Sequence, residues 1–373
     1  MRALFLSTPL PSHVYPMVPL AWALRAAGHD VLIGTSGPGL AVAGSGLDVV
    51  DFDPRGETPS VAELNARRPD IVTSRATKVA EGQPLLIQVT QRYAAHMAAL
   101  AKRWRPDLVV HSQLQGGGPI AAATVGVPSV EHGGSLLRGD DFYEGLPEQI
   151  PETFAELSIA GLPERRAAIE IGPPSMVAPP PGAWPMRYLP FNGGGVLPED
   201  LSRPATRPRI AVTVGTNILA PNMATLLART IAAAPGLDAD LVLLLSGMVE
   251  AAGLGRDLPA NVRLVEQWLP LRPLLSTCAA IIHHGGGGSI LAALDAGVPQ
   301  LAVPSSAPNY LQSDAVRERG VGLTAEAEEV DPALIHRVLT DEKLRQSAVE
   351  VRAEMAGLPT PADVVPRLVA LAG

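Results

Sequence analysis

The sequence predicts an α/β protein of two domains, each built on a parallel sheet with crossover helices. At 373 residues the chain is too long for one ordinary domain and suits two. Short aliphatic and β-branched runs alternate with Ala- and Leu-rich stretches, which is typical of parallel strands joined by helices. This alternation occurs twice, on either side of a Pro- and Gly-rich stretch at residues 173–208. Two such domains imply a cleft.

The first series of elements begins at the N-terminus. A helix is expected at residues 18–27, where Gly28 stops it. Residues 55–80 and 137–170 are polar, interrupted by Pro and poorly periodic, so they are predicted as loops and short helices that contact substrate. The strands expected in this series are residues 3–7, 30–34, 108–111 and 128–131.

The second series begins at Arg209. We expect its strands at residues 210–214, 241–245, 262–265, 280–283 and 300–303. The chain is therefore divided into an N-terminal domain at 1–195, a linker at 196–208, a C-terminal domain at 209–356 and a C-terminal segment at 357–373. Whether that last segment crosses back to the N-terminal domain is left open.

Composition excludes several classes of partner. The net charge of -8 and a pI near 5.5 argue against nucleic acid and anionic membranes, which both select for clustered Lys and Arg. No apolar run reaches membrane-spanning length. The single cysteine, Cys278, permits no intrachain disulfide, and the apolar start of the chain is too short for a signal peptide. We therefore expect a cytoplasmic protein.

The most informative segment is residues 280–294, where a buried strand breaks at His283 and His284 into four glycines and a serine before a helix. Glycines let backbone N–H groups approach a ligand, and the helix N-terminus adds partial positive charge. One helix end contributes only about 0.3–1 kcal/mol, so several N–H groups and a histidine must share a diphosphate. The alternative is a flexible turn with two structural histidines. The residues predicted to hold the diphosphate are His283, Gly286, Gly287, Gly288 and Ser289.

This run resembles the donor-phosphate motif of family 1 glycosyltransferases, in the form found in actinobacterial enzymes that glycosylate enediynes, angucyclines and macrolides. The resemblance covers nearly the whole chain, and calicheamicin-type enzymes look most similar. It implies the GT-B fold, with two Rossmann-like doubly wound domains facing a central cleft. The other matching segments are residues 186–193 (linker), 263–270 (base-binding), 296–300 (after the phosphate helix) and 358–362 (C-terminal segment).

The resemblance also implies an activity. It is the inverting, metal-independent transfer of a sugar from a thymidine diphosphate (TDP) sugar to a small hydrophobic natural-product aglycone in antibiotic biosynthesis. The nucleotide sugar is then a co-substrate, and no cofactor or metal is expected. A sugar-nucleotide 2-epimerase and a non-catalytic nucleotide-sugar-binding helper remain as alternatives. The sequence leaves open a homodimer and an activator protein.

Two short motifs are set aside. Asp238 and Asp240 spell an Asp-x-Asp metal motif, but they precede a predicted strand where such a motif would follow one, and we interpret them as a turn. Gly37 and Gly39 follow a strand without the third glycine of the dinucleotide fingerprint, so a nicotinamide dehydrogenase is not favoured.

Trp268 is predicted to stack on the donor base. A pyrimidine needs an apolar face, and stacking contributes about 1–3 kcal/mol per base in nucleic-acid-binding proteins. In the family the next residue, here Leu269, meets the base through its backbone. Thr216, after the strand at 210–214, is a further candidate that would offer a hydroxyl and an N–H to the phosphates. The alternative for Trp268 is a core tryptophan, and the alternative for Thr216 is a simple strand-capping role.

His13 is the predicted catalytic base. Residues 7–16 resemble the family's Gly-His-x-x-Pro loop, with Ser12 in the glycine position, where it is a donor-binding candidate. A neutral imidazole, with an ordinary pKa of about 6.5, takes the proton of an acceptor hydroxyl as the sugar transfers. Such help is worth about 10²–10⁴ in rate. The alternative is an incidental loop histidine.

The group that orients His13 is not settled by the sequence. Many family members place an aspartate just after the strand at 108–111, where this chain has Ser112. Either Ser112 or Gln113 orients the ring more weakly, or a carboxylate does so from elsewhere. The carboxylate candidates are Glu131, Asp140 and Asp141. The departure also leaves open a non-oxygen acceptor or an activating partner.

The donor sugar is predicted from a second departure. After Pro304 the family commonly carries an Asp-Gln pair that binds sugar hydroxyls, and this chain has Pro308 and Asn309 there. A site that has lost its acceptor fits a sugar that lacks hydroxyls, so a TDP-deoxysugar is expected. Asn309 is the predicted sugar contact, with Gln312 or Asp314 as lesser candidates. The alternative is that the loop has merely shifted.

Overall fold

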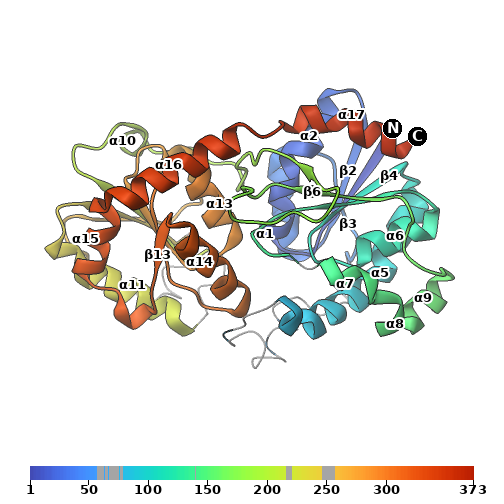
Figure 1. Ribbon diagram of the computed structural model, residues 1–373, viewed down its shortest axis with the longest axis horizontal. Helices are drawn as coiled ribbons and strands as arrows, with labels where there is room; N and C mark the ends of the chain where they lie inside the picture. Colours follow the sequence, from blue (N-terminus) through green and yellow to red (C-terminus); the bar gives the residue numbers. More distant parts are fainter. Residues whose placement is uncertain are drawn as a thin grey trace. The chain divides into compact units, whose positions relative to one another are not determined.

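The computed structural model describes residues 1–56, 63, 66, 75, 79–138, 140–215, 221–245 and 257–373. The chain divides into two compact units (Figure 1). The N-terminal unit contains Met1–Phe191 and Gly357–Gly373, and the C-terminal unit contains Asn192–Ala356. Residues 192–195, which we assigned to the N-terminal domain from the sequence, thus lie in the C-terminal unit.

The described part of the N-terminal unit contains a parallel sheet of order β3-β2-β1-β4-β5-β6-β7. The chain leaves β1 in one direction and returns to β4 on its other side, so the sheet is doubly wound and reverses between these two strands. The strands are β1 (Arg2–Leu6), β2 (Asp30–Thr35), β3 (Val49–Asp51), β4 (Leu108–Ser112), β5 (Ser129–His132), β6 (Arg166–Glu170) and β7 (Trp184–Pro185).

Helices cover this sheet. They are α1 (Pro11–Val14), α2 (Val18–Ala26), α5 (Gln83–Trp104), α6 (Gly117–Val125), α7 (Asp140–Glu144), α8 (Leu146–Gln149), α9 (Pro151–Leu157) and α17 (Pro361–Ala372), with 3-10 helices η1 (Tyr15–Met17), η2 (Gly37–Ser45) and η3 (Val79–Gly82). The long helix α5 is amphipathic because its apolar residues recur at helical spacing. Its residues Tyr93, Met97 and Leu100 pack on Leu4 and Val109 of the sheet.

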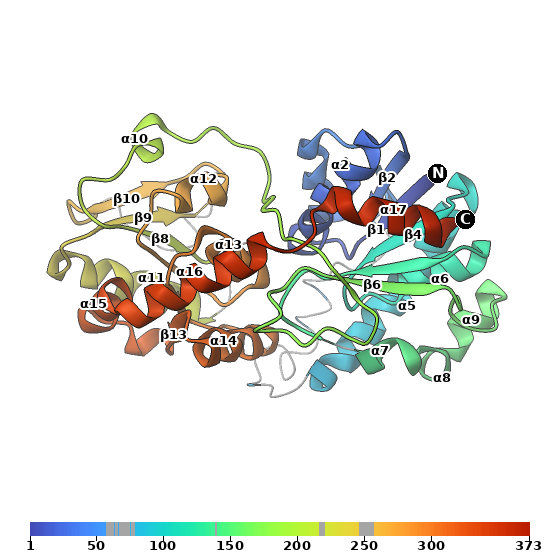
Figure 2. The ribbon, with the colours of Figure 1, turned by 45° about the horizontal axis from the view of Figure 1, so that its top comes forward.

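The C-terminal helix α17 belongs to the N-terminal unit, although it is last in the sequence. It lies beside α2, as the red and blue helices of Figure 2 show. A capping box starts it, because the Thr360 hydroxyl accepts from the Asp363 N–H and the Asp363 carboxylate accepts from the Thr360 N–H. The backbone N–H of Arg187 donates to the Pro359 carbonyl at 2.7 Å and ties down the approach to this helix.

The C-terminal unit repeats the doubly wound topology, with sheet order β10-β9-β8-β11-β12-β13 among the described residues. Its strands are β8 (Arg209–Thr213), β9 (Asp240–Leu244), β10 (Val262–Val265), β11 (Ala280–His283), β12 (Gln300–Ala302) and β13 (Gly322–Thr324). Its helices are α10 (Glu199–Ser202), α11 (Pro221–Ala233), α12 (Leu271–Leu275), α13 (Gly287–Ala296), α14 (Ala307–Arg319), α15 (Pro332–Thr340) and α16 (Glu342–Ala356), with 3-10 helices η4 (Ala234–Gly236) and η5 (Ala327–Glu329).

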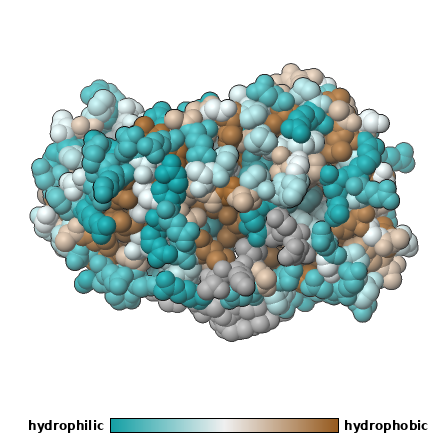
Figure 3. Space-filling view, in the orientation of Figure 1, coloured by the Kyte–Doolittle hydropathy of each residue, from teal (hydrophilic) through white to brown (hydrophobic). Residues whose placement is uncertain are grey.

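Apolar side chains bury both faces of the second sheet. One core contains Ile210, Leu241 and Ile282, and the core on the other face contains Ala211 and Ile281. Successive residues of one strand thus point into different cores, which explains why these strands read as continuous apolar runs. On the face drawn in Figure 3, by contrast, hydrophilic residues cover much of the surface.

The structure confirms the predicted fold class of two Rossmann-like sheets and every strand expected from the sequence, with small shifts at the ends. The prediction of loops and short helices for 137–170 is wrong at β6, which pairs with β5 in the sheet. Its sequence, Arg-Ala-Ala-Ile-Glu, carries one β-branched residue, so pairing with β5 decides its conformation rather than local propensity. Strands β3, β7 and β13 are two or three residues long and were also missed.

Candidate functional site

Doubly wound sheets bind ligands beyond the carboxyl ends of their strands, where the strand order reverses. In the N-terminal unit that place is the end of β1 and β4, which pair through Leu6 and His111. The Thr8 N–H donates to the Ser112 hydroxyl at 3.3 Å and links the segments that follow the two strands. The chain then begins helix α1 at Pro11, so the predicted loop over residues 7–16 is helical in its second half.

His13 lies in the last turn of α1, a few residues beyond the end of β1. Its side chain is partly buried, and Ser12 beside it is exposed. Burial lowers the pKa of His13 from 6.5 to about 4, because the charged ring is less well solvated there than in water. The imidazole is therefore neutral at pH 7, which is the state in which it can accept a proton.

The three described side chains expected to orient His13 bind other groups. Ser112 receives the Thr8 N–H, as stated above. Gln113 donates to the Leu137 carbonyl and accepts from the Ser135 hydroxyl at 3.1 Å, so it holds the loop after β5. The Glu131 carboxylate accepts from the Tyr143 hydroxyl at 3.0 Å and from the Leu114 N–H at 3.4 Å. The side chains of Asp140 and Asp141 lie outside the described residues. Within the described ranges, no hydrogen bond orients the His13 ring.

In the C-terminal unit the sheet reverses between β8 and β11, and β11 ends at His283. The His283 side chain is completely buried. Its Nδ1 accepts the Gly285 N–H at 3.0 Å, so the proton lies on Nε2, which donates to the side-chain Oε1 of Gln300 at 2.9 Å. Burial lowers its pKa to about 3. Since both ring nitrogens are used inside the fold, His283 shapes the glycine turn and has no donor left for the diphosphate role that we expected.

His284 is the histidine that the sequence analysis passed over. Its Nδ1 is buried and has no hydrogen-bond partner among the residues that the structure describes. The ring lies between Gly215 and Gly286, and a side chain at either glycine would collide with it. Burial lowers the pKa of His284 to about 4, against an opposing contribution from the Thr213 backbone. The alternation of side chains along a strand could have identified His284, because a His283 that points into the core turns the next side chain away from it.

Helix α13 begins at an open N-terminus. Gly286 is its N-cap in extended conformation, and no side chain caps it. The Gly286 carbonyl accepts from Ser289 and Ile290, so the N–H groups of Gly287 and Gly288 precede the first intrahelical bonds. Gly288 is exposed, and a Cβ placed there would meet nothing within 4 Å. This geometry suits an anion, because backbone donors and the helix dipole point to the same place.

Helix α14 supports the glycine turn from its other side. Asn309 is buried, and its amide donates to the His284 carbonyl at 2.8 Å and to the Ser305 hydroxyl at 3.3 Å. Gln312 is also buried and donates to the Pro308 carbonyl at 3.3 Å. The amide N–H groups of both residues thus serve the fold. Thr216, the remaining phosphate candidate, lies outside the described residues.

Trp268 follows β10 and is 37% exposed, which excludes the core alternative. Its indole N–H donates to the backbone carbonyl of Asn192 at 2.5 Å. Leu269 is buried, and its carbonyl accepts from the Asn192 side-chain amide at 3.3 Å. An exposed ring with its N–H fixed presents a flat apolar face to solvent.

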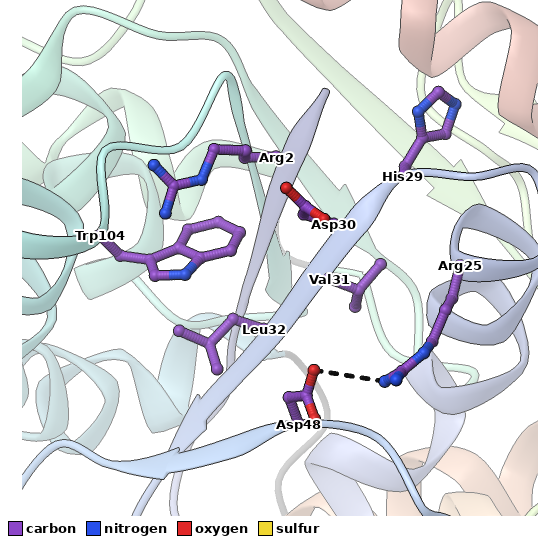
Figure 4. Close-up of a pocket in the computed structure, with 8 residues that line it drawn as sticks. All are labelled: Arg2, Arg25, His29, Asp30, Val31, Leu32, Asp48 and Trp104. Atoms are coloured by element: carbon purple, nitrogen blue, oxygen red, sulfur yellow. Dashed lines mark hydrogen bonds and ion pairs between the residues drawn. The ribbon is translucent and has the colours of Figure 1, made fainter.

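A hollow of about 290 Å³ lies at the opposite edge of the N-terminal sheet (Figure 4). Arg2 and Asp30 line it from the starts of β1 and β2, so it is not at the ligand-binding edge. The Arg2 guanidinium stacks 4.5 Å from the Trp104 ring centre, and Arg25 pairs with Asp48 at 3.3 Å. These cations therefore already have partners within the protein.

Further observations concern the Asp-x-Asp motif, metal binding, membrane-spanning helices and the single cysteine. Arg207 pairs with Asp238 at 3.1 Å and with Asp240 at 3.3 Å, which agrees with their interpretation as a turn. Over the described ranges, no cluster of three or more His, Cys, Asp or Glu residues could hold a metal ion. No helix in the described part of the chain is long and apolar enough to span a membrane. Burial raises the pKa of the Cys278 thiol to about 12.

Two family models match the chain. The N-terminal domain of the erythromycin biosynthesis protein CIII-like proteins matches residues 22–215, and the C-terminal domain matches residues 228–371. Among curated proteins, the elloramycin glycosyltransferase of Streptomyces olivaceus is 38% identical over 99% of this chain and 97% of its own length. The aclacinomycin-T 2-deoxy-L-fucose transferase of Streptomyces galilaeus is 31% identical over 99% of this chain and 95% of its own.

Solved structures agree with this. The glycosyltransferase SnogD from Streptomyces nogalater has a TM-score of 0.83 and 40% identity, covering 100% of this chain and 99% of that one. The glycosyltransferase SsfS6 from Streptomyces sp. SF2575, complexed with thymidine diphosphate, has a TM-score of 0.79 and 32% identity, with 99% of each chain covered. The structural similarity therefore extends over both units of the chain.

Proposed function

This chain belongs to the erythromycin biosynthesis protein CIII-like family of glycosyltransferases. From that membership we propose that it transfers the sugar of a TDP-deoxysugar to a polyketide-type aglycone. One observation carries the proposal. The open N-terminus of α13, with His284 beside it, lies where the C-terminal sheet reverses direction. A nucleotide diphosphate is the ligand whose charge and length suit that place.

On the donor side, the diphosphate binds the N–H groups of Gly287 and Gly288, and the Ser289 hydroxyl lies within the same first turn. His284 replaces His283 as the side chain that meets the phosphates, since of these two adjacent histidines it is the one with a buried nitrogen that has no partner among the described residues. Trp268 supplies the stacking face for thymine. The Leu269 carbonyl is occupied by Asn192, so the Leu269 N–H is the backbone group offered to the base.

On the acceptor side, His13 takes the proton of the attacking hydroxyl. Its lowered pKa supports this, because the ring is neutral over the whole physiological range. A base with a pKa near 4 is weak in the free protein, so the pKa of His13 has to rise as the hydroxyl proton is transferred. Attack in line with the departing diphosphate inverts the anomeric carbon, as the family implies.

The proposal also covers the cofactor, the location, the alternative functions and the partners of the protein. The reaction has no resident cofactor, since the nucleotide sugar is consumed as a co-substrate. A cytoplasmic location follows from the sequence argument on Cys278. The relatives named above are transferases, which favours transfer over 2-epimerisation or a silent helper role. A homodimer and an activator protein stay open.

The test is incubation of the purified protein with a TDP-deoxysugar and a panel of polyketide aglycones, followed by mass spectrometry of both substrates. Transfer gives a glycosylated aglycone and free TDP in equal amounts. A 2-epimerase would alter the sugar nucleotide without any acceptor, and a helper would alter neither substrate. Either of those results would overturn the proposal.

A further inference from the structure

Asn192 lies in the segment at 186–193 that resembles the family linker, and it makes an unusual set of contacts for a residue of such a segment. Its side-chain amide donates to the Leu269 carbonyl at 3.3 Å, and its side-chain oxygen accepts from the Leu271 N–H at 3.0 Å. Its backbone carbonyl accepts from the Trp268 indole N–H at 2.5 Å. One residue therefore fixes both the backbone around Trp268 and the orientation of its ring.

Gly195, just after this segment, also passes close to the residues around Trp268. A Cβ on Gly195 would lie 2.9 Å from the Trp268 carbonyl and 3.0 Å from Pro270, so only glycine permits the chain to pass so closely. Asn192 and the Trp268 segment both belong to the C-terminal unit, and all of these contacts lie within it. The chain crosses from the N-terminal unit directly before Asn192, since that unit ends at Phe191.

An exposed indole needs such a restraint in order to act as a stacking face. Trp268 is 37% exposed, so packing alone does not select one orientation of its ring. A hydrogen bond from its N–H restricts rotation about the side-chain bonds before any ligand arrives. Ordering a group in advance strengthens binding because the ligand no longer bears that entropic cost.

We propose that Asn192 is a positioning residue for the donor nucleotide, which acts by holding Trp268 in the orientation that stacks on thymine. This inference rests on the proposed function, because it assumes that Trp268 meets the base. It adds that the first residue of the C-terminal unit is part of the donor site. Donor affinity thus depends on the linker as well as on the sheet.

The test combines TDP binding with a direct view of the indole. The four tryptophans can be labelled with 5-fluorotryptophan, and Trp268 is the one that lies beyond Asn192 in sequence. Trp268→Phe assigns its ¹⁹F resonance. In Asn192→Ala, with no nucleotide present, we expect that resonance to shift or broaden while the other three stay in place. The backbone carbonyl that accepts from the indole remains in this variant, but it loses the two side-chain hydrogen bonds that hold it against Leu269 and Leu271, so TDP alone should bind about 5- to 30-fold more weakly. The donor KM should rise while kcat at saturating donor changes little.

Asn261 offers a matched control. It is also a half-buried asparagine of the C-terminal unit, and its amide donates to the Ala234 and Ala239 carbonyls at 2.7 and 2.9 Å. Asn261→Ala should lower the melting temperature without moving the Trp268 resonance or the donor KM. Asn192→Asp keeps the acceptor for Leu271 and loses the donor to Leu269, so an intermediate effect is expected.

The outcomes separate the two proposals. If Trp268→Ala leaves TDP affinity unchanged, the assignment of Trp268 as the base-stacking residue fails, and this inference fails with it. If Trp268→Ala weakens TDP but Asn192→Ala and Asn192→Asp change neither affinity nor the resonance, only the positioning role is wrong. Equal losses of affinity in Asn192→Ala and Asn261→Ala would indicate a general loss of stability and would also overturn it.

Discussion

The two adjacent histidines of the donor motif should respond in opposite ways to truncation. His284→Ala removes a ring whose Nδ1 has no partner among the described residues and whose interaction is with the Thr213 backbone, so the free protein should lose less stability than with His283→Ala. Its cost should appear when the diphosphate binds. A hydrogen bond to a charged group contributes about 1.5–3 kcal/mol, which corresponds to a roughly 10- to 150-fold rise in the Kd of TDP.

His283→Ala should instead destabilise the C-terminal unit. It removes the ring that now bonds to the Gly285 N–H and to the side-chain Oε1 of Gln300, and both of these groups are buried. Each orphaned group costs about 1–3 kcal/mol, so a total of about 2 kcal/mol or more is expected. For a unit of this size that lowers the melting temperature by roughly 4–8 °C.

The assay is isothermal titration calorimetry with TDP, paired with thermal unfolding of both variants followed by circular dichroism. Binding should be measured well below the lower melting temperature, so that the fraction of folded protein is the same. The reasoning would be refuted if His284→Ala bound TDP normally while His283→Ala bound it weakly at full stability. That result would restore His283 to the phosphate role.

Three further predictions concern the acceptor side, the base and pH. His13→Ala should lower kcat by about 10²–10⁴ and leave the Kd of TDP unchanged, because His13 lies in the other unit, and turnover near the native rate would contradict its role as the base. Trp268→Ala should weaken TDP binding by about 1–3 kcal/mol with an unchanged melting temperature, as titration calorimetry would show. Burial lowers the pKa of His111 and His132 to about 4 and that of His283 to about 3, so the unfolded chain takes up protons below about pH 6.5 while the folded chain does not. Stability should thus be complete above about pH 6.5 and fall toward pH 4, and a melting temperature that stays constant across that window would show that these rings are not held neutral.

The strands that could be predicted from sequence are those whose own residues favour extended structure. β8, β9 and β11 contain the uninterrupted apolar runs Ile-Ala-Val, Leu-Val-Leu-Leu and Ala-Ile-Ile, as a sheet buried on both faces requires. β6 has no such run and forms because β5 offers it a neighbour. Pairing of that kind depends on residues distant in sequence, so local propensity does not reveal it.

The same limit applies to the candidate site. The motif around residues 283–289 correctly predicted a strand end followed by a helix, and the structure adds that no side chain caps this helix. The motif did not show which histidine is fully hydrogen-bonded inside the fold, because that depends on Gln300 of the neighbouring strand β12, whose side chain bonds to His283. The exposure of Trp268 likewise could not be predicted from the sequence, since an aromatic residue after a strand can belong to either the core or the surface.

Asn309 shows how the structure alters the argument about the donor sugar. The sequence suggested that this residue is the sugar contact that survives where the family's aspartate is lost. Its amide N–H instead donates to the His284 carbonyl, so the group that could donate to a hydroxyl already holds the glycine turn after β11 in place. The start of α14 then offers two serines, Ser305 and Ser306, with Ala307 and Pro308. Ser305 already receives a hydrogen bond from Asn309. Few side-chain partners therefore remain there for a fully hydroxylated sugar, and each unmatched hydroxyl would lose its hydrogen bonds to water on binding. A deoxysugar avoids that loss, so the buried state of Asn309 favours the same donor class as the missing aspartate, for a different physical reason.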